Sequence, residues 1–133
     1  MRRRQTGTAL RPAEHIADLR LEVESCGTQL VLALDTVLGH LPRRPSGPQI
    51  LANNVGITLA TASRLLKGLA QKDPIGSLHM LPGPKPLTDF VRRTVDQGVP
   101  EEVGAAAELA IEAFDRIIRD VVGGRGPFKS LLT

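Results

Sequence analysis

The side chains that most often do chemistry in proteins are few in this sequence and far apart. Its three histidines are His15, His40 and His79, and none of them has the HExxH spacing that puts two metal ligands on one helix face. Its one cysteine, Cys26, falls on an apolar helix seam, where a cysteine more often fills space than attacks a substrate. We therefore expect no catalytic residue, no metal site and no cofactor.

Two other patterns also have structural explanations. Glu101 and Glu102 stand where a helix should begin, and acidic side chains are favourable at the positive end of a helix dipole. The glycine-rich segment 123–127 lacks the lysine and the hydroxyl residue of a phosphate-binding loop. Neither pattern indicates an enzyme.

A different kind of chemistry is indicated by residues 48–67, which read PQILANNVGITLATASRLLK. Two short helices in close contact need a small side chain where they cross, and a residue that tolerates positive φ in the turn between them. Ala52 and Gly56 stand four residues apart in these roles, and Thr58 can cap the second helix. The side chains expected to form the shared core are Leu51, Val55, Ile57, Ala62 and Leu65.

This alanine and glycine, followed by Thr61-Ala62-Ser63-Arg64-Leu65-Leu66, resemble the helix-turn-helix of bacterial transcription regulators of the lac-repressor, cyclic-AMP-receptor and IclR types. The resemblance covers residues 48–67 only and departs at Ala62, where those regulators usually have Val or Ile. It implies that a helix over residues 59–69 reads the major groove of duplex DNA. The side chains that would face the bases are Thr58, Leu59, Ala60, Ser63 and Arg64, and those nearer the phosphates are Gln49, Thr61 and Lys67.

The residue types suit these implied roles. Arg64 can donate a bidentate fork to guanine, while Leu59 and Ala60 can pack on a thymine methyl group. No acidic residue occurs between Asp35 and Asp73, so the local field that phosphates would meet is positive. The bases in this interval are Arg43, Arg44, Arg64, Lys67 and Lys72, of which the Arg43–Arg44 pair and Lys67 are expected to contact the DNA backbone.

The boundaries of the helix-turn-helix follow from local signals. Ser46 and Gln49 have the spacing of a capping box, with Pro48 just inside the helix. After the second helix, Asp73-Pro74 is expected to break the chain, and residues 75–81 to form a short strand, which would be a reduced wing. Residues 82–86 then read as a rigid turn, followed by a helix over residues 88–97.

Two longer helices, over residues 13–38 and 100–122, flank this unit. Both have apolar side chains at heptad spacing, which fits packing within the chain and also dimerisation with a second copy. Gly27 is expected to kink or divide the first of them. The expected organisation is a flexible basic arm (1–11), an N-terminal helical segment (12–41), a helix-turn-helix DNA-binding core (42–99), a C-terminal packing or dimerisation helix (100–123) and a tail (124–133).

Composition agrees with a globular helical protein. With 41% hydrophobic and 23% charged residues the chain is neither disordered nor membrane-spanning, and its three Phe without Tyr or Trp disfavour recognition of single strands by stacking. The sequence therefore predicts an all-α fold of about five helices, with one short strand or hairpin at most. It further predicts a cytoplasmic, sequence-specific binder of double-stranded DNA, with helices 13–38 and 100–122 available either for packing within the chain or for a homodimer. The alternative is a helical protein-interaction or adaptor module that does not bind DNA.

Overall fold

The computed structural model describes residues 12–121, and the side chains of residues 18–119. The predicted all-α class is confirmed, because the described chain holds six α-helices and no strand. The arm (1–11) and the tail (124–133) lie outside the described residues. The helices are α1 (Pro12–Gly39), α2 (Pro48–Val55), α3 (Leu59–Ala70), α4 (Pro74–Met80), α5 (Pro84–Asp96) and α6 (Glu101–Arg116), and a π-helical turn, Ile117–Val121, follows α6.

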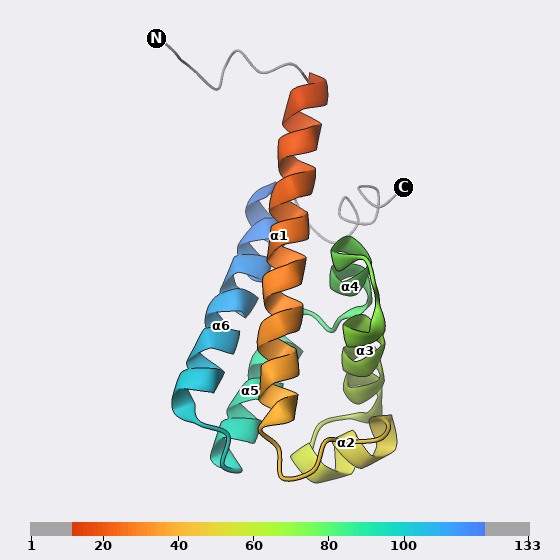
Figure 1. Cartoon of the computed structure of the whole chain (residues 1–133), viewed down its shortest axis with the longest axis vertical. Coiled ribbons are helices and arrows are strands. Elements are labelled where there is room, and N and C mark those ends of the chain that lie inside the picture. The colour runs from red at the N-terminus through yellow and green to blue at the C-terminus, as the bar shows by residue number, and fades with distance from the viewer. Residues whose placement is uncertain (1–11, 122–133) are drawn as a thin grey trace.

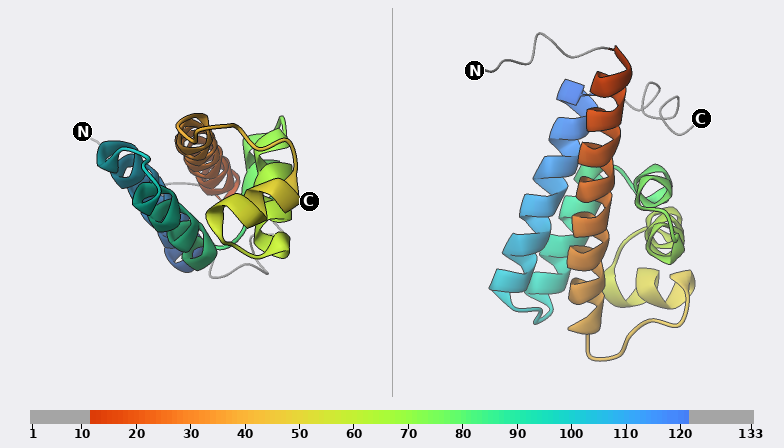
Figure 2. Two further views of the ribbon diagram at one scale, coloured as in Figure 1. Left: turned by 90° about the horizontal axis from the view of Figure 1, so that it is seen from below. Right: turned by 45° about the horizontal axis from the view of Figure 1, so that its top comes forward.

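Helix α1 is the axis of the molecule. Figure 1 shows α5 and α6 on one side of it and α2, α3 and α4 on the other, and the views in Figure 2 agree. Helix α1 packs chiefly against α6 and α4, while α3 packs against both α2 and α4. Helices α2 and α3 are therefore held at one flank of a helical bundle.

One hydrophobic core joins the two sides. Helix α1 contributes Leu30, Leu34 and Leu38, all without significant exposure, and the largest buried side chains are Phe90 of α5 and Phe114 of α6. Burying a side chain of this size stabilises a fold by about 1.5–3 kcal/mol relative to leaving it exposed. This core fixes the α5–α6 pair against α1, and it gives α2 and α3 a rigid support.

The predicted kink at Gly27 is wrong, since α1 runs without interruption from Pro12 to Gly39. The glycine instead allows a close approach between helices. A Cβ at position 27 would overlap the carbonyl group of Pro74, at the start of α4. The contact lies 47 positions away in the chain, so no local pattern could have indicated it.

The expected strand over residues 75–81 is the helix α4. Asp73 is its N-cap, and the carboxylate accepts hydrogen bonds from the N–H groups of Ile75 (3.4 Å) and Gly76 (3.3 Å). Pro74 occupies the first helical turn, where a missing N–H costs nothing. The Asp-Pro pair thus begins a helix here, and the described chain has no wing.

Helix α5 also begins earlier than predicted, at Pro84 rather than at Thr88. Pro84 and Pro86 both lie in its first turn, which needs no intrahelical N–H donors. The expected end is confirmed, since Gly98 has a φ of 115° just beyond the helix. Within the described residues, no helix is both long enough and apolar enough to cross a membrane.

Candidate nucleic-acid interface

Helix α2 begins one residue later than the capping-box hypothesis requires. Its N-cap is Gly47, in an extended conformation and without a side-chain cap hydrogen bond. Pro48 explains the shift, because its fixed φ suits the first position of a helix and the preceding residue then becomes the cap. Ser46 is left outside the helix, and the predicted capping box with Gln49 is wrong.

The turn after α2 has the conformation that the sequence indicates. Gly56 has φ 85° and ψ 34°, in the left-handed region that side chains disfavour. The backbone N–H groups of Gly56 and Ile57 both donate to the carbonyl oxygen of Ala52, at 2.9 and 3.2 Å. The turn is therefore closed on the last turn of α2, and its direction toward α3 is fixed.

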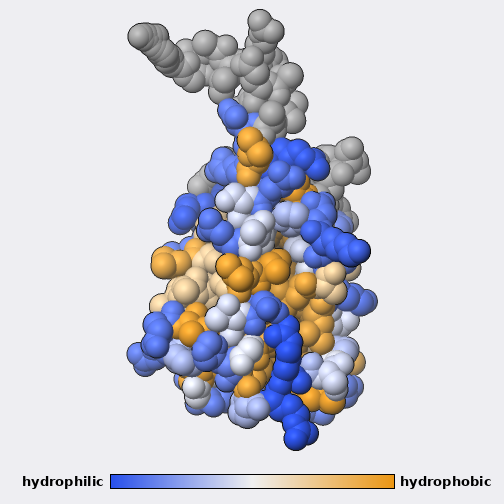
Figure 3. Space-filling view, viewed as in Figure 1, coloured by the Kyte–Doolittle hydropathy of each residue, from blue (hydrophilic) through white to orange (hydrophobic). Residues whose placement is uncertain are grey.

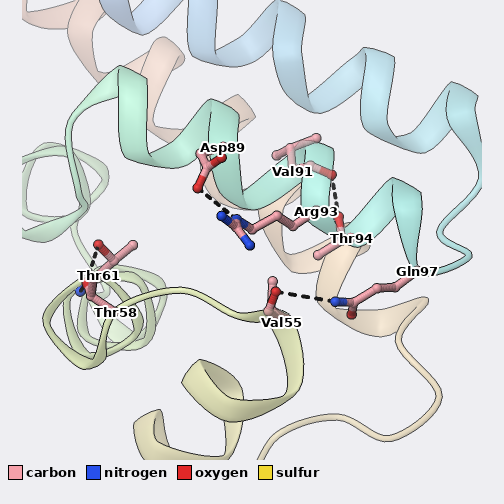
Figure 4. A network of polar contacts seen from close by, with 8 residues as sticks. All are labelled: Val55, Thr58, Thr61, Asp89, Val91, Arg93, Thr94 and Gln97. Atoms are coloured by element: carbon pink, nitrogen blue, oxygen red, sulfur yellow. Dashed lines mark hydrogen bonds and ion pairs between the residues drawn. The ribbon is translucent and has the colours of Figure 1, made fainter.

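Thr58 caps α3, as predicted. Its Oγ1 accepts a hydrogen bond from the N–H of Thr61 (3.1 Å), and its hydroxyl donates to Oγ1 of Thr61 (3.0 Å), as Figure 4 shows. Both hydroxyl groups therefore take part in the hydrogen bonds that cap the N-terminal end of α3. Thr58 is exposed and Thr61 half-buried, so Thr58 has the better access to a ligand.

The inner faces of α2 and α3 form the predicted shared core. The side chains buried between them and the bundle are Leu51, Ala52, Val55, Ala62 and Leu65, and Ile57 is half-buried. Ala62 has no exposed surface although it is smaller than the Val or Ile that the resemblance would favour. The two helices accordingly form one packed unit.

The outer face of α3 is open to solvent. Leu59 is 50% exposed, Ala60, Arg64 and Lys67 are also exposed, and Ser63 is half-buried. Residues 60, 64 and 67 follow one another at helical spacing and so share this face. Neither Arg64 nor Lys67 has an ion-pair partner among the described residues, and residues 48–70 contain no carboxylate.

The other predicted contact residues lie outside α3. Gln49 is exposed on α2, and Arg43 and Arg44 are exposed in the loop between α1 and α2. Arg44 forms an ion pair with Asp35 of α1. The segment between Asp35 and Asp73 contains no acidic residue, but the fold brings Asp35 itself next to Arg44. Among the described residues, Arg43 therefore has no ion-pair partner, whereas the charge of Arg44 is neutralised.

Arg93 of α5 and Gln97, which caps the C-terminal end of α5, support the turn and were missed by sequence reasoning. The amide nitrogen Nε2 of Gln97 donates to the carbonyl oxygen of Val55 at 3.3 Å, which satisfies the C-terminal end of α2. Arg93 bonds Asp89 through its Nε at 2.9 Å, and its Nη1 lies 3.2 Å from where a Cβ on Gly56 would be. Figure 4 shows the Arg93 side chain on α5 and the Gln97 side chain at the end of that helix, both directed toward the α2–α3 turn.

The only cysteine of the sequence, Cys26, lies in the hydrophobic core. The Cys26 side chain is buried, and burial, with Glu22 acting in the same direction and Arg116 opposing it, raises the pKa of its thiol to about 11. The thiol is therefore protonated at neutral pH and a poor nucleophile. Among the described residues, no three His, Cys, Asp or Glu side chains gather closely enough to hold a metal ion.

Comparisons with protein families, with curated proteins and with solved structures found no match to this chain.

Proposed function

We propose that this chain binds duplex DNA by laying the outer face of α3 in the major groove, and that it acts in bacterial transcription regulation. The observation that carries the proposal is the α2–turn–α3 unit. It combines a left-handed Gly56, a Thr58 cap and a solvent-exposed second helix, whose Arg64 and Lys67 have no ion-pair partner in the described part of the chain. Binding to duplex DNA would place the chain in the cytoplasm, at the nucleoid.

The side chains on this face offer the contacts that base recognition requires. Arg64 can donate two hydrogen bonds to O6 and N7 of guanine, which is the commonest specific contact in the major groove. Leu59 is half exposed in the first turn of α3, and an apolar side chain there can contact a thymine methyl group. Ser63 lies between them and can bond either kind of base, since its hydroxyl both donates and accepts.

The charges near this face suit approach to phosphates. Lys67 lies in the last turn of α3, and Arg43 lies in the loop before α2. No carboxylate on α2 or α3 opposes them. Each phosphate contact of this kind adds sequence-independent affinity and makes binding salt-dependent.

Contacts with the rest of the bundle hold α2 and α3 in a fixed position, and with them the outer face of α3. The Ala52 carbonyl closes the turn, Gln97 holds the end of α2, and Leu65 anchors α3 in the core. A recognition helix that is fixed before binding loses little conformational entropy when it enters the groove.

Binding of a labelled mixed-sequence duplex, followed by fluorescence anisotropy over a series of salt concentrations, tests the proposal. We expect log K to fall linearly with log salt, and Lys67→Ala to reduce the magnitude of that slope by about 1. Arg20→Ala is the matched control, since Arg20 is exposed on α1 and pairs with Glu24, and it should leave the slope unchanged. Absence of binding at low salt contradicts the proposal.

A helical protein-interaction module is the competing function. A groove of about 630 Å³ between α1 and α6 favours it, because exposed leucines line that groove. The anisotropy experiment separates the two functions, since a module of this class has no reason to bind duplex DNA. The same groove is also compatible with a DNA-binding dimer.

A further inference from the structure

The most exposed apolar side chains of the described surface lie on the two long helices. Leu32 of α1 and Leu109 of α6 are each 66% exposed, and both line the groove between these helices. Figure 3 shows hydrophobic side chains gathered at mid-height across α6 and α1. A contiguous apolar surface of this kind marks an interaction site more often than isolated exposed leucines do.

The small side chains beside Leu109 make the groove accessible to another helix. Ala106 and Ala113 lie about one turn before and after Leu109 on α6, and Ala110 follows it directly; all three line the groove. With alanines at the contact, the axes of two packed helices can approach to the short end of the usual range of about 8–10 Å.

The charges at the ends of the groove are arranged symmetrically about its apolar centre. Glu102 precedes Leu109 by seven residues and Arg116 follows it by seven, and all three side chains line the groove. At a rise of about 1.5 Å per residue, each charge lies roughly 10 Å along the helix axis from Leu109. Neither Glu102 nor Arg116 has an ion-pair partner among the described residues.

We propose that the groove between α1 and α6 binds the same groove of a second copy, with the two α6 helices antiparallel about a two-fold axis at Leu109. In a two-fold interface each residue contacts its counterpart reciprocally, so a self-complementary surface must carry opposite charges at equal distances from the axis. Glu102 of each copy then meets Arg116 of the other, and Leu109 and Leu32 are buried at the centre.

The opposite wall of the groove does not interfere with this pairing. On α1, Leu32 is flanked one turn away on either side by Gln29 and Thr36, both uncharged. No like charges are brought together along this wall. An unrelated partner would have no reason to match the symmetric placement of Glu102 and Arg116 on α6, whereas a second copy matches it necessarily.

The mass of the full chain in solution, measured by sedimentation equilibrium over a range of concentrations, tests the interface. The monomer mass is 14.3 kDa, and we expect a species of twice that mass. Leu109→Glu should weaken dimerisation by more than tenfold, because it puts two carboxylates on the axis. Leu21→Glu is the matched control, since Leu21 is also 65% exposed on α1 but does not line the groove. It should leave the dimer intact.

Charge reversal tests the geometry of the pairing. Glu102→Arg alone and Arg116→Glu alone should each weaken the dimer, and the double variant should recover it. An equimolar mixture of the two single variants should form a mixed dimer, since each chain then carries the charges that the other lacks.

The interface is overturned if the wild-type chain stays monomeric, if Leu109→Glu leaves its dimer unchanged, or if the double reversal fails to restore a dimer that the single reversals weaken. Far-UV circular dichroism of each variant confirms that it is folded. The measurement involves no DNA, so its result is independent of the DNA-binding proposal.

Discussion

Replacing Gly56 by alanine should lower the free energy of unfolding, because alanine is strained in the backbone conformation of the α2–α3 turn. The residue sits at φ 85° and ψ 34°, and an L-residue in this region costs roughly 1–2 kcal/mol. The added methyl group would also stand 3.2 Å from Nη1 of Arg93, but that guanidinium group ends a flexible side chain and can shift. Part of the strain is offset, because alanine lowers the entropy of the unfolded chain by about 0.4–1 kcal/mol. We expect a net loss of about 1 kcal/mol.

Urea denaturation followed by circular dichroism measures this loss. Gly56→Asn should lose less than Gly56→Ala, because asparagine tolerates the left-handed region. Gly39→Ala is the control: Gly39 has no positive φ and open space around it, so alanine there should be neutral or stabilising. If Gly56→Ala is as stable as Gly39→Ala, the turn geometry is wrong and the helix-turn-helix argument loses its basis.

Three further predictions concern the cap, the loop and the thiol. Thr58→Ala should cost about 1 kcal/mol of unfolding free energy by removing the N-cap of α3, whereas Thr28→Ala, at an exposed site within α1, should not. Asp35→Asn should raise low-salt affinity for duplex DNA and steepen its salt dependence, because it releases Arg44; an unchanged slope would mean that Arg44 does not reach a phosphate. Cys26 should react with a thiol reagent about a hundredfold more slowly at pH 8 in the folded than in the unfolded protein, since its pKa rises from 9.0 to about 11. The same shift predicts that the thiol does not change the free energy of unfolding below pH 9 and lowers it as the pH rises toward 11, because the unfolded chain loses the thiol proton first. Equal reaction rates in the folded and unfolded protein would contradict both predictions.

The parts of the site that could be predicted depend on signals within a few residues. Gly56 and Thr58 are recognisable because a left-handed turn and an N-cap each restrict the residue type at one position. The buried positions of α2 and α3 follow from helical spacing in the same way. The long helices α1 and α6 were found by the same periodicity, at nearly their observed bounds.

The errors arose where one local pattern fits two structures. Proline after Asp73 is compatible with a chain break and with the first turn of a helix, and the strand hypothesis followed from choosing the break. The capping box failed for a related reason, since Pro48 at the first helical position leaves Ser46 one residue too early to cap. In both cases the positional preference of proline decided the outcome.

The remaining contacts could not be read from sequence at all. The pairing of Arg44 with Asp35 depends on how the α1–α2 loop folds back, and Gln97 reaches Val55 across 42 positions. Such contacts are set by tertiary packing, so spacing along one chain does not indicate them. They bear on the proposed DNA binding, because the first lowers the net charge beside α2 and the second helps to hold α2 in place.

Selection of bound sequences from a random duplex library is the most direct test of DNA recognition by α3. The wild-type chain should enrich a motif that contains a guanine. Arg64→Ala should lose the preference at that guanine, and Lys67→Ala should weaken binding to all sequences about equally while keeping the motif. Enrichment of no motif by the wild-type chain, or an identical motif from Arg64→Ala, would contradict the account.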